Sequence, residues 1–410
     1  MRRPLTALIL AGAATAVATP PSSAARSTSA PIDAAITRAI KGRHIVGTEV
    51  IIAIRGRIVY HRRAGLADRE NKLPVSKNQT FRLASVSKIY VATAAVVLAS
   101  RGAINLDDPV TRYLPDFRPR LNGEPLPITI RELMTHTAGL SYPFLETPTS
   151  PYRRLGVSSG LDQPGLSFSK QLGRLSRAGL VYRPGTAWKY SLSIDVLGAV
   201  VAKAYGAPLP EAVRALVLAP LGLRDTGFAV KHRRQLAIAY AKTGDGLVRM
   251  TCPQTVPFPG AGDVVFSPCR AWNDRSYPSG GAGMVGSVSD LERLLETLRN
   301  GGRPLFGPRY ARMMTTNQIG GLVTILGPGW GFGFGGAVLL DARAHSPQAV
   351  GTWGWSGAYG NNWFVDPKNG LTVVAFTNSA PEGDSGRYTT DLRDSIYDAL
   401  PSLRKRAAIR

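Results

Sequence analysis

The first candidate for chemistry is the sequence Ser85-Val86-Ser87-Lys88, which has the pattern S-x-x-K at the start of an apolar stretch. Side chains three positions apart lie on one face of a helix, so the Lys88 amine can reach the Ser85 hydroxyl. A serine hydroxyl is a poor nucleophile until a neutral amine takes its proton, and burial favours the neutral form of lysine. The helix N-terminus also favours developing negative charge. The pattern therefore predicts a nucleophilic serine, although so short a motif also arises by chance on solvated helices.

Three other short patterns compete with Ser85, and their context argues against each. Residues 156–160 fit G-x-S-x-G, but a nucleophile elbow needs a buried strand before it and a helix after it. Neither is indicated there. Residues 383–386 read Gly-Asp-Ser-Gly without a histidine in a matching upstream context, and the Lys-Thr-Gly of residues 242–244 lies in a predicted hairpin turn before a long helix. Ser85 therefore remains the preferred nucleophile.

The hydrophobic pattern predicts the elements that must position these side chains. Apolar residues at helical spacing predict helices over 31–43, 85–101, 192–205, 288–298 (capped by Ser287 or Ser289) and 391–400. A capping box of Thr129 and Glu132 begins another helix, which we expect to stop at Gly139. Strands are expected at 50–54, 58–60, 236–250 (a hairpin turning at 244–246), 330–340, 362–365 and 371–378. Residues 147–184 are rich in Pro, Ser and Gly and predict a long loop with a short helix at 169–177.

The segments around Ser85 resemble the serine β-lactamase-related family, especially its class C branch and the family VIII carboxylesterases. The resemblance runs from about residue 63 to residue 378, through residues 65–70, 81–88, 133–140, 184–191, 220–228, 280–290 and 353–378 in order. It implies an α+β fold of the β-lactamase and D,D-peptidase (penicillin-binding transpeptidase-like) type, with an antiparallel sheet flanked by helices and an all-helical region. The catalytic domain would span 31–400, with a discontinuous α/β part (31–84 and 235–400) around a helical part (85–234).

The same resemblance implies roles for further residues. Tyr190 matches the tyrosine of the family's Y-x-N motif and would share a proton with Lys88 as general base and acid. Residues 355–357, Trp-Ser-Gly, fall where the family carries K-T-G, H-T-G or, in the esterases, W-G-G. The backbone N–H of Ala358 would pair with that of Ser85 as an oxyanion hole. The alternative interpretation of Tyr190 and Trp355 is that they are core aromatic residues.

Two departures from the family pattern bear on the substrate. Leu192 stands where the motif has Asn, and Trp355 stands where β-lactamases have Lys or His. Both replacements remove polar groups that hold the amide and carboxylate of a lactam. Together with Ser356 and Gly357, these residues are expected to bind the substrate in an apolar pocket that suits esters. Nearby arginines could restore a carboxylate contact, so lactam turnover is disfavoured rather than excluded.

Composition limits the remaining functions. The 410 residues include 44% apolar and 19% charged residues, as in ordinary globular proteins, and 50 Lys and Arg against 27 Asp and Glu give a net charge of +23. No five consecutive residues are basic, and no zinc-finger or RNP pattern is present, which argues against nucleic-acid binding. The basic charge instead fits mild attraction to acidic cell-envelope polymers.

The first residues predict export. Arg2 and Arg3 precede an apolar stretch at 5–18, which is too short for a membrane anchor and is followed by small residues. We expect a signal peptide over 1–25, with cleavage after Ala18 or Ala25. No later segment is long enough to span a membrane.

Export makes a disulfide between the two cysteines, Cys252 and Cys269, plausible, with two unpaired thiols as the alternative. The five histidines are scattered, so we expect no metal and no other cofactor. The leading hypothesis is an exported serine hydrolase that forms an acyl-enzyme on small-acyl esters. The alternatives are a β-lactamase, a peptidase acting on D-amino-acid or peptidoglycan fragments, and a catalytically silent protein that binds wall fragments.

Overall fold

A computed structural model describes residues 29–163, 165–228, 230, 235–244, 246–258, 260–273, 275–344 and 347–408. The predicted signal peptide, residues 1–25, lies outside the described residues. Within the described part of the chain, no helix is long and apolar enough to cross a membrane.

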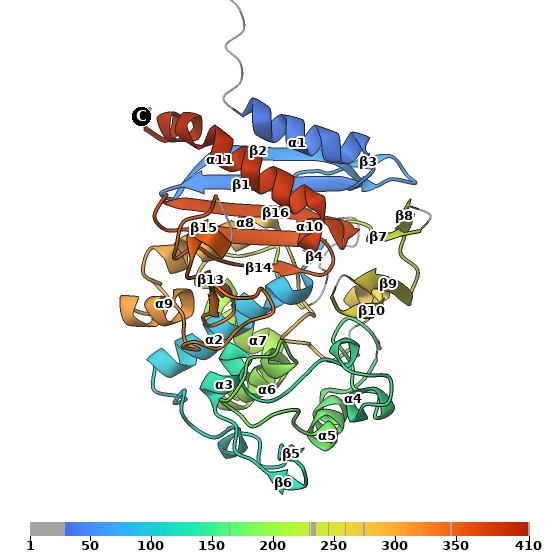
Figure 1. Cartoon of the computed structure of the whole chain (residues 1–410), viewed down its shortest axis with the longest axis vertical. Coiled ribbons are helices and arrows are strands. Elements are labelled where there is room, and N and C mark those ends of the chain that lie inside the picture. The colour runs from blue at the N-terminus through green and yellow to red at the C-terminus, as the bar shows by residue number, and fades with distance from the viewer. Residues whose placement is uncertain are drawn as a thin grey trace, which may run out of the picture.

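One antiparallel sheet of eight strands forms the frame of the molecule (Figure 1). Its order is β12-β13-β14-β15-β16-β1-β2-β3. The bounds are β1 (Gly47–Ile54), β2 (Arg57–Asp68), β3 (Leu73–Pro74), β12 (Trp330–Phe332), β13 (Ala337–Leu339), β14 (Trp353–Gly357), β15 (Asn361–Asp366) and β16 (Leu371–Thr377). These strands come from the two ends of the chain, and β1 pairs with β16 over seven registered positions from Thr48 to Ile54. The predicted antiparallel sheet flanked by helices is confirmed.

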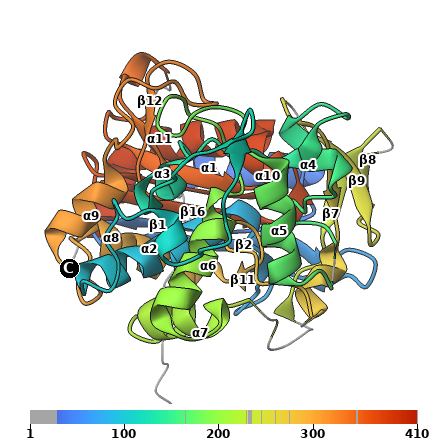
Figure 2. The ribbon, with the colours of Figure 1, turned by 90° about the horizontal axis from the view of Figure 1, so that it is seen from below.

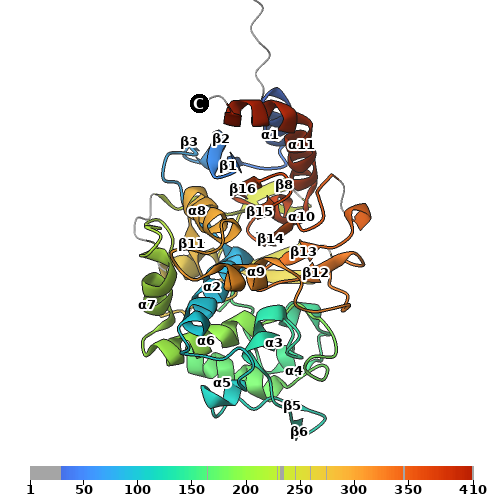
Figure 3. The same ribbon diagram turned by 90° about the vertical axis from the view of Figure 1, so that its left-hand side faces the viewer.

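Helices cover both faces of this sheet. The first and last helices, α1 (Ala30–Lys41) and α11 (Arg387–Ala408), pack together on one face (Figures 1 and 3). On the other face lies α8 (Val288–Arg299), whose first turn is capped by the Ser287 hydroxyl accepting from the backbone N–H of Asp290. Every residue of β1 is buried, as expected for a strand covered on both sides.

Most of the remaining helices gather below the sheet around α2 (Ser87–Ser100), as Figure 2 shows from that side. Thirteen of the fourteen residues of α2 are buried, because neighbouring elements surround this helix. It follows directly on a short 3-10 turn, η1 (Ala84–Val86). The other helices of this region are α3 (Ile130–Thr135), α4 (Pro151–Arg154), α5 (Phe168–Ala178), α6 (Ser193–Tyr205) and α7 (Leu209–Val213), followed by the π-helical turn η4 (Arg214–Leu218).

Several short elements complete the fold. They are the strands β4 (Phe81–Arg82), β5 (Arg120–Leu121), β6 (Glu124–Pro125), β7 (Tyr240–Thr243), β8 (Gly246–Arg249), β9 (Gln254–Phe258), β10 (Gly262–Phe266), β11 (Val285–Gly286) and β17 (Ser379–Ala380), the helices α9 (Pro308–Thr315) and α10 (Glu382–Ser385), and the 3-10 turns η2 (Val110–Arg112), η3 (Pro143–Leu145), η6 (Pro268–Trp272) and η7 (Ala342–Ala344). The pair β9–β10 and the helix α10 both contribute side chains to the cavity described below.

Several predicted boundaries differ from the structure; the strand expected at 58–60, for example, is part of the longer β2. The helix that begins at Thr129 ends at Thr135, because His136 adopts a left-handed conformation with φ of 59° and closes the helix before Gly139 is reached. The predicted strand 330–340 is broken into β12 and β13 by a turn. The last helix continues to residue 408 through Pro401, and Leu403 beyond the proline is buried in the core between α11 and the sheet.

A disulfide joins Cys252 and Cys269, whose Cα atoms are 6.0 Å apart. It connects the chain just before β9 to the turn η6 (Pro268–Trp272), so it closes a hairpin that forms one wall of the cavity.

Removing both sulfurs with Cys252→Ala and Cys269→Ala should lower the free energy of unfolding by about 3 kcal/mol, because the open loop has more entropy in the unfolded chain. Guanidinium titrations of the two proteins measure this difference. A reductant should shift the midpoint of the wild type and leave that of the double variant unchanged. Identical midpoints for the wild type and the double variant would contradict the expectation.

Candidate active site

Ser85 lies in the turn η1 at the entrance to α2, with its side chain at the wall of a cavity of about 560 Å³. The preceding residue, Ala84, is completely buried and has φ of 44°, a region that residues with a β-carbon rarely occupy. Such a conformation costs energy and persists only where the surroundings enforce it. The strained turn places the Ser85 hydroxyl in front of the helix N-terminus.

Lys88 lies one turn along α2, as the S-x-x-K spacing predicts. Its Nζ is 3.1 Å from Oγ of Ser85 and donates a hydrogen bond of 2.8 Å to the carbonyl oxygen of Gly281. Burial lowers the pKa of the Lys88 ammonium from 10.5 to about 7. A large fraction of Lys88 is therefore the neutral amine near pH 7, which is the form that can accept the serine proton.

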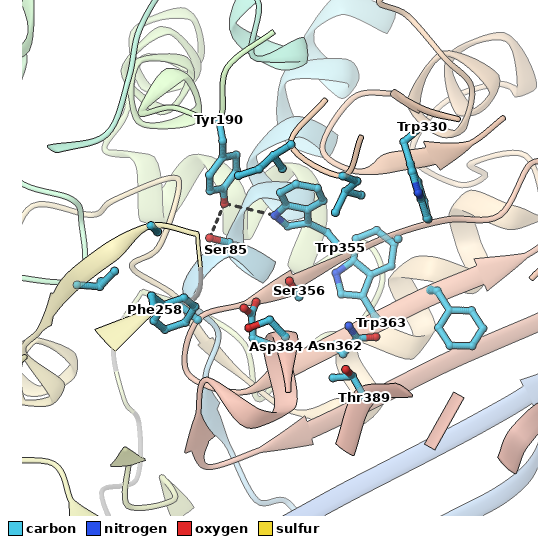
Figure 4. A pocket seen from close by; sticks show the side chains of 18 of the residues that line it. Ser85, Tyr190, Phe258, Trp330, Trp355, Ser356, Asn362, Trp363, Asp384 and Thr389 are labelled. Carbon is cyan, nitrogen blue, oxygen red and sulfur yellow. Dashed lines mark hydrogen bonds between the residues drawn. The ribbon is translucent and has the colours of Figure 1, made fainter. Parts of the chain in front are cut away.

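Tyr190 approaches Ser85 from the chain just before α6. Its hydroxyl donates a hydrogen bond of 2.6 Å to Oγ of Ser85, and the indole Nε1–H of Trp355 donates to the Tyr190 oxygen over 3.3 Å (Figure 4). Burial raises the pKa of Tyr190 above its ordinary value of 10. The phenol therefore keeps its proton at neutral pH, so Lys88 is the better base and Tyr190 the better proton donor.

Asp195 is a functional candidate that the sequence analysis missed. It lies on α6, almost completely buried, and a β-carbon placed on Gly281 would sit 2.5 Å from Oδ2 of Asp195 and 3.4 Å from Nζ of Lys88. The carboxyl and the amine therefore face each other across a residue that has no room for a side chain. Burial raises the pKa of Asp195 to about 6, and its negative charge in turn raises the pKa of Lys88. The sequence feature that could have identified Asp195 is a single acidic residue within the apolar segment that follows Tyr190.

The predicted oxyanion hole depends on the close approach of β14 to η1. A β-carbon on Gly357 would collide with the carbonyl oxygen of Leu83, so only glycine allows the strand to come this near. Ala358, the residue after β14, lines the same cavity as Ser85. The arrangement fits the predicted pair of backbone N–H donors, from Ser85 and Ala358, at one end of the cavity.

Two of the four residues predicted to bind the substrate line the cavity. Trp355 and Ser356 line the cavity, as expected. Leu192 does not; it is fully buried in the main apolar core, where it precedes the first turn of α6. Gly357 does not line the cavity either, because it packs against Leu83. Leu192 and Gly357 thus lie behind the residues that line the cavity.

A cluster of aromatic side chains packs around Tyr190 and Trp355. The rings of Trp355 and Phe332 are edge to face with centroids 5.3 Å apart, and Tyr190 lies 5.2 Å from Trp355. His136 packs 5.0 Å from Tyr190, and burial lowers its pKa well below 6.5, so it is neutral. Close aromatic packing fixes the directions of Tyr190 and Trp355.

The competing motifs occupy other surroundings. Ser158 of the G-x-S-x-G pattern is buried and hydrogen-bonds to Asp162, and residues 242–244 fall in and after β7. The Gly-Asp-Ser-Gly pattern is different, since its Asp384 and Ser385 line the cavity. Among the described residues, no group of His, Cys, Asp and Glu is arranged to hold a metal ion.

Comparison with known proteins agrees with this geometry. A sequence profile described as Beta-lactamase matches residues 32–398. The chain belongs to the beta-lactamase family. It is an enzyme of the serine hydrolase class, with Ser85 as the predicted nucleophile of the family's S-x-x-K pattern. The predicted resemblance and the α+β fold are thereby confirmed.

The similar proteins include esterases. The chain is 47% identical to Esterase EstB of Burkholderia gladioli over 379 residues, which cover 91% of this chain and 96% of that protein. The structure of EstCE1, described as a hydrolase with promiscuous acyltransferase activity, is 42% identical, with a TM-score of 0.88, and the match covers 91% of this chain and 99% of that one. The penicillin-binding protein homologue from Pyrococcus abyssi shares the fold, with a TM-score of 0.69 at 21% identity over 91% of this chain and 77% of that one.

The buried Lys88 predicts a specific pH dependence. Because the reacting form carries a neutral amine, kcat/KM should rise with pH through an apparent pKa near 7 and level off above it. The Asp195→Asn variant removes the negative charge that raises the pKa of Lys88, so this limb should move to lower pH.

Steady-state rates on one ester from pH 5 to 9 measure the rise of kcat/KM in the wild type and in Asp195→Asn. Asp398→Asn, on the exposed surface of α11, is the matched control and should leave the limb in place. If kcat/KM of Asp195→Asn rises at the same pH as that of the wild type, or at a higher pH, the Asp195 carboxylate does not act on Lys88.

Proposed function

We propose that the protein is an exported carboxylesterase that cleaves small-acyl esters through an acyl-enzyme on Ser85. The observation that carries this proposal is the set of contacts joining Ser85 to Lys88 and Tyr190, with the indole of Trp355 in place of a cation beside the phenol.

The geometry supports a complete cycle. Oγ of Ser85 attacks the ester carbonyl carbon while its proton passes to the neutral Lys88, and the backbone N–H groups of Ser85 and Ala358 stabilise the negative oxygen. The bond to the leaving oxygen then breaks as Tyr190 gives that oxygen a proton. Lys88 replaces the proton of Tyr190 with the one that it took from Ser85. Water activated by the same pair attacks the acyl-enzyme, releases the carboxylic acid and restores Ser85.

The cavity wall favours esters over lactams. A lactam of the β-lactam drugs carries a carboxylate, which is usually met by a Lys or His at the position that Trp355 occupies here. The neutral indole instead hydrogen-bonds to Tyr190, and the neighbouring wall includes Phe144, Leu161 and Phe258. Such a surface suits an uncharged, partly apolar ester.

The names of the similar proteins support the same reaction class. Esterase EstB and EstCE1 are esterases or hydrolases by name, and the second is also described as an acyltransferase. An acyl-enzyme can be attacked by an alcohol as well as by water, so acyl transfer to an alcohol would use the same residues of this chain.

The proposed place of action is outside the cytoplasm. The charged and apolar start of the sequence and the Cys252–Cys269 disulfide both suit an oxidising, extracytoplasmic compartment. There, the net charge of +23 would draw the enzyme toward acidic envelope polymers.

Side-by-side rates on a chromogenic butyrate ester and a chromogenic cephalosporin test the proposal, with Ser85→Ala as the blank. We expect ester turnover at least about a hundredfold faster than cephalosporin cleavage, and a loss of about a thousandfold or more in Ser85→Ala. Faster cephalosporin cleavage would instead favour a β-lactamase. A protein that a fluorophosphonate does not label at Ser85 would favour a silent binding role.

A further inference from the structure

The cavity that contains Ser85 has a polar end that the catalytic cycle does not use. Its side chains come from β14, β15, α10 and α11, and Figure 4 shows them gathered on one side of Ser85, below it in this view. We call the following four residues the polar end: Ser356, Asn362, Asp384 and Thr389. Another part of the wall, formed by Phe144, Leu161, Phe258 and Val264, is apolar.

Asp384 gives the polar end a negative charge. Burial raises the pKa of its carboxyl to about 6, while the hydroxyls of Ser356 and Ser385 lower it, and no Lys or Arg in the described part of the chain is among these influences. The carboxyl is therefore ionised at pH 7 and above. Arg393 also lines the cavity, but its guanidinium is paired with Asp394 at 2.7 Å. Among the described residues, no Lys or Arg side chain forms an ion pair with the Asp384 carboxylate.

The polar end is electrostatically connected to the reacting centre. The negative charge of Asp384 is one of the influences that raise the pKa of the Tyr190 phenol. Tyr190 in turn hydrogen-bonds to Ser85 and to Trp355, the residue next to Ser356 in β14. A group seated at the polar end would therefore lie beside the proton donor for the leaving oxygen.

We propose that the polar end binds the alcohol portion of the ester and selects an alcohol that carries an ammonium group, while it repels carboxylates. The inference rests on the proposed esterase function, because it assigns the two halves of the ester to the two ends of the cavity. The leaving oxygen must lie next to Tyr190, which donates its proton, so the alcohol portion extends toward Trp355 and Ser356. The acyl group is then directed to the apolar wall.

The charge of Asp384 is what distinguishes this chain's site from a carboxylate-binding one. A carboxylate at the wall of a partly dehydrated cavity attracts a cation more strongly than it would in water. It equally disfavours a second carboxylate nearby. The hydroxyl of Ser356 and the amide of Asn362 offer hydrogen bonds to a neutral polar alcohol, and of the four residues of the polar end Asp384 is the one whose charge distinguishes positive from negative ligands.

Three butyrate esters of similar shape test the proposal. They are butyrylcholine, which carries a permanent positive charge, its uncharged isostere 3,3-dimethylbutyl butyrate, and 3-(butyryloxy)propanoate, which carries a carboxylate. Values of kcat/KM are measured at pH 8 by titration of the released acid. We expect the cationic ester to exceed the neutral one by about tenfold and the anionic ester to be the slowest.

The substitution Asp384→Asn should reduce the preference for the cationic over the neutral ester to about twofold or less. The matched control is Asp391→Asn on α11, whose carboxylate pairs with Arg387 and does not line the cavity. This control should keep the full preference. A preference that survives unchanged in Asp384→Asn would overturn the assignment of the polar end.

The pH dependence of the wild type gives a second measurement that needs no variant. The charge of butyrylcholine is permanent, and the limb due to Lys88 is common to both esters and cancels in their ratio. The ratio should therefore fall as pH drops through about 6, where Asp384 becomes protonated. The hydroxyls of Ser356 and Ser385 interact with the Asp384 carboxyl, and the titratable or charged side chains that line the same cavity are Tyr142, Tyr190 and Arg393.

The outcomes separate the two proposals. Turnover of all three esters at equal rates would overturn the charge selection and leave the esterase function intact. Absence of Ser85-dependent turnover of any of them would overturn the proposed function itself.

Discussion

Burial of the Lys88 amine beside Ser85 is the interaction on which the rest of the structure depends. An ammonium group inside an apolar helix is strongly disfavoured, and the protein resolves this by lowering the pKa of Lys88. The carbonyl oxygen of Gly281 and the carboxyl of Asp195 limit this decrease in the pKa of Lys88. Both the neutral amine and the ammonium form are therefore populated near pH 7. The helices around α2 keep water away from this pair, and the sheet brings the remaining groups to its open side.

The strand β14 determines what this centre can act on. Gly357 lets the strand touch the turn before Ser85, which brings Trp355 into hydrogen-bonding contact with Tyr190. An indole N–H there supplies a donor without adding a charge. A carboxylate that lines the cavity, Asp384, adds a negative charge instead. Both features disfavour anionic substrates. The uncharged Trp355 of β14 and the carboxylate of Asp384 in α10 therefore indicate the same class of ester.

The sequence was sufficient for the parts of the site that lie close together in the chain. The spacing of Ser85 and Lys88 follows from helix geometry, while Tyr190 and Trp355 required a resemblance to known proteins. Asp195 and Asp384 were missed because their importance comes from contacts between distant segments. Leu192 was placed in the pocket by alignment alone, and the structure shows its side chain in the core. The helix through Pro401 was missed because burial of the turn beyond it outweighs the lost hydrogen bond.

The most direct test of the account is the titration of Lys88 itself. In protein labelled with ¹³C at the ε-carbon of lysine, the resonance that disappears in Lys88→Met reports this one amine. The account predicts that its chemical shift titrates with a midpoint near pH 7. A midpoint near the ordinary value of 10.5 would mean that Lys88 is an ammonium group at neutral pH, and the assignment of the base would then be wrong.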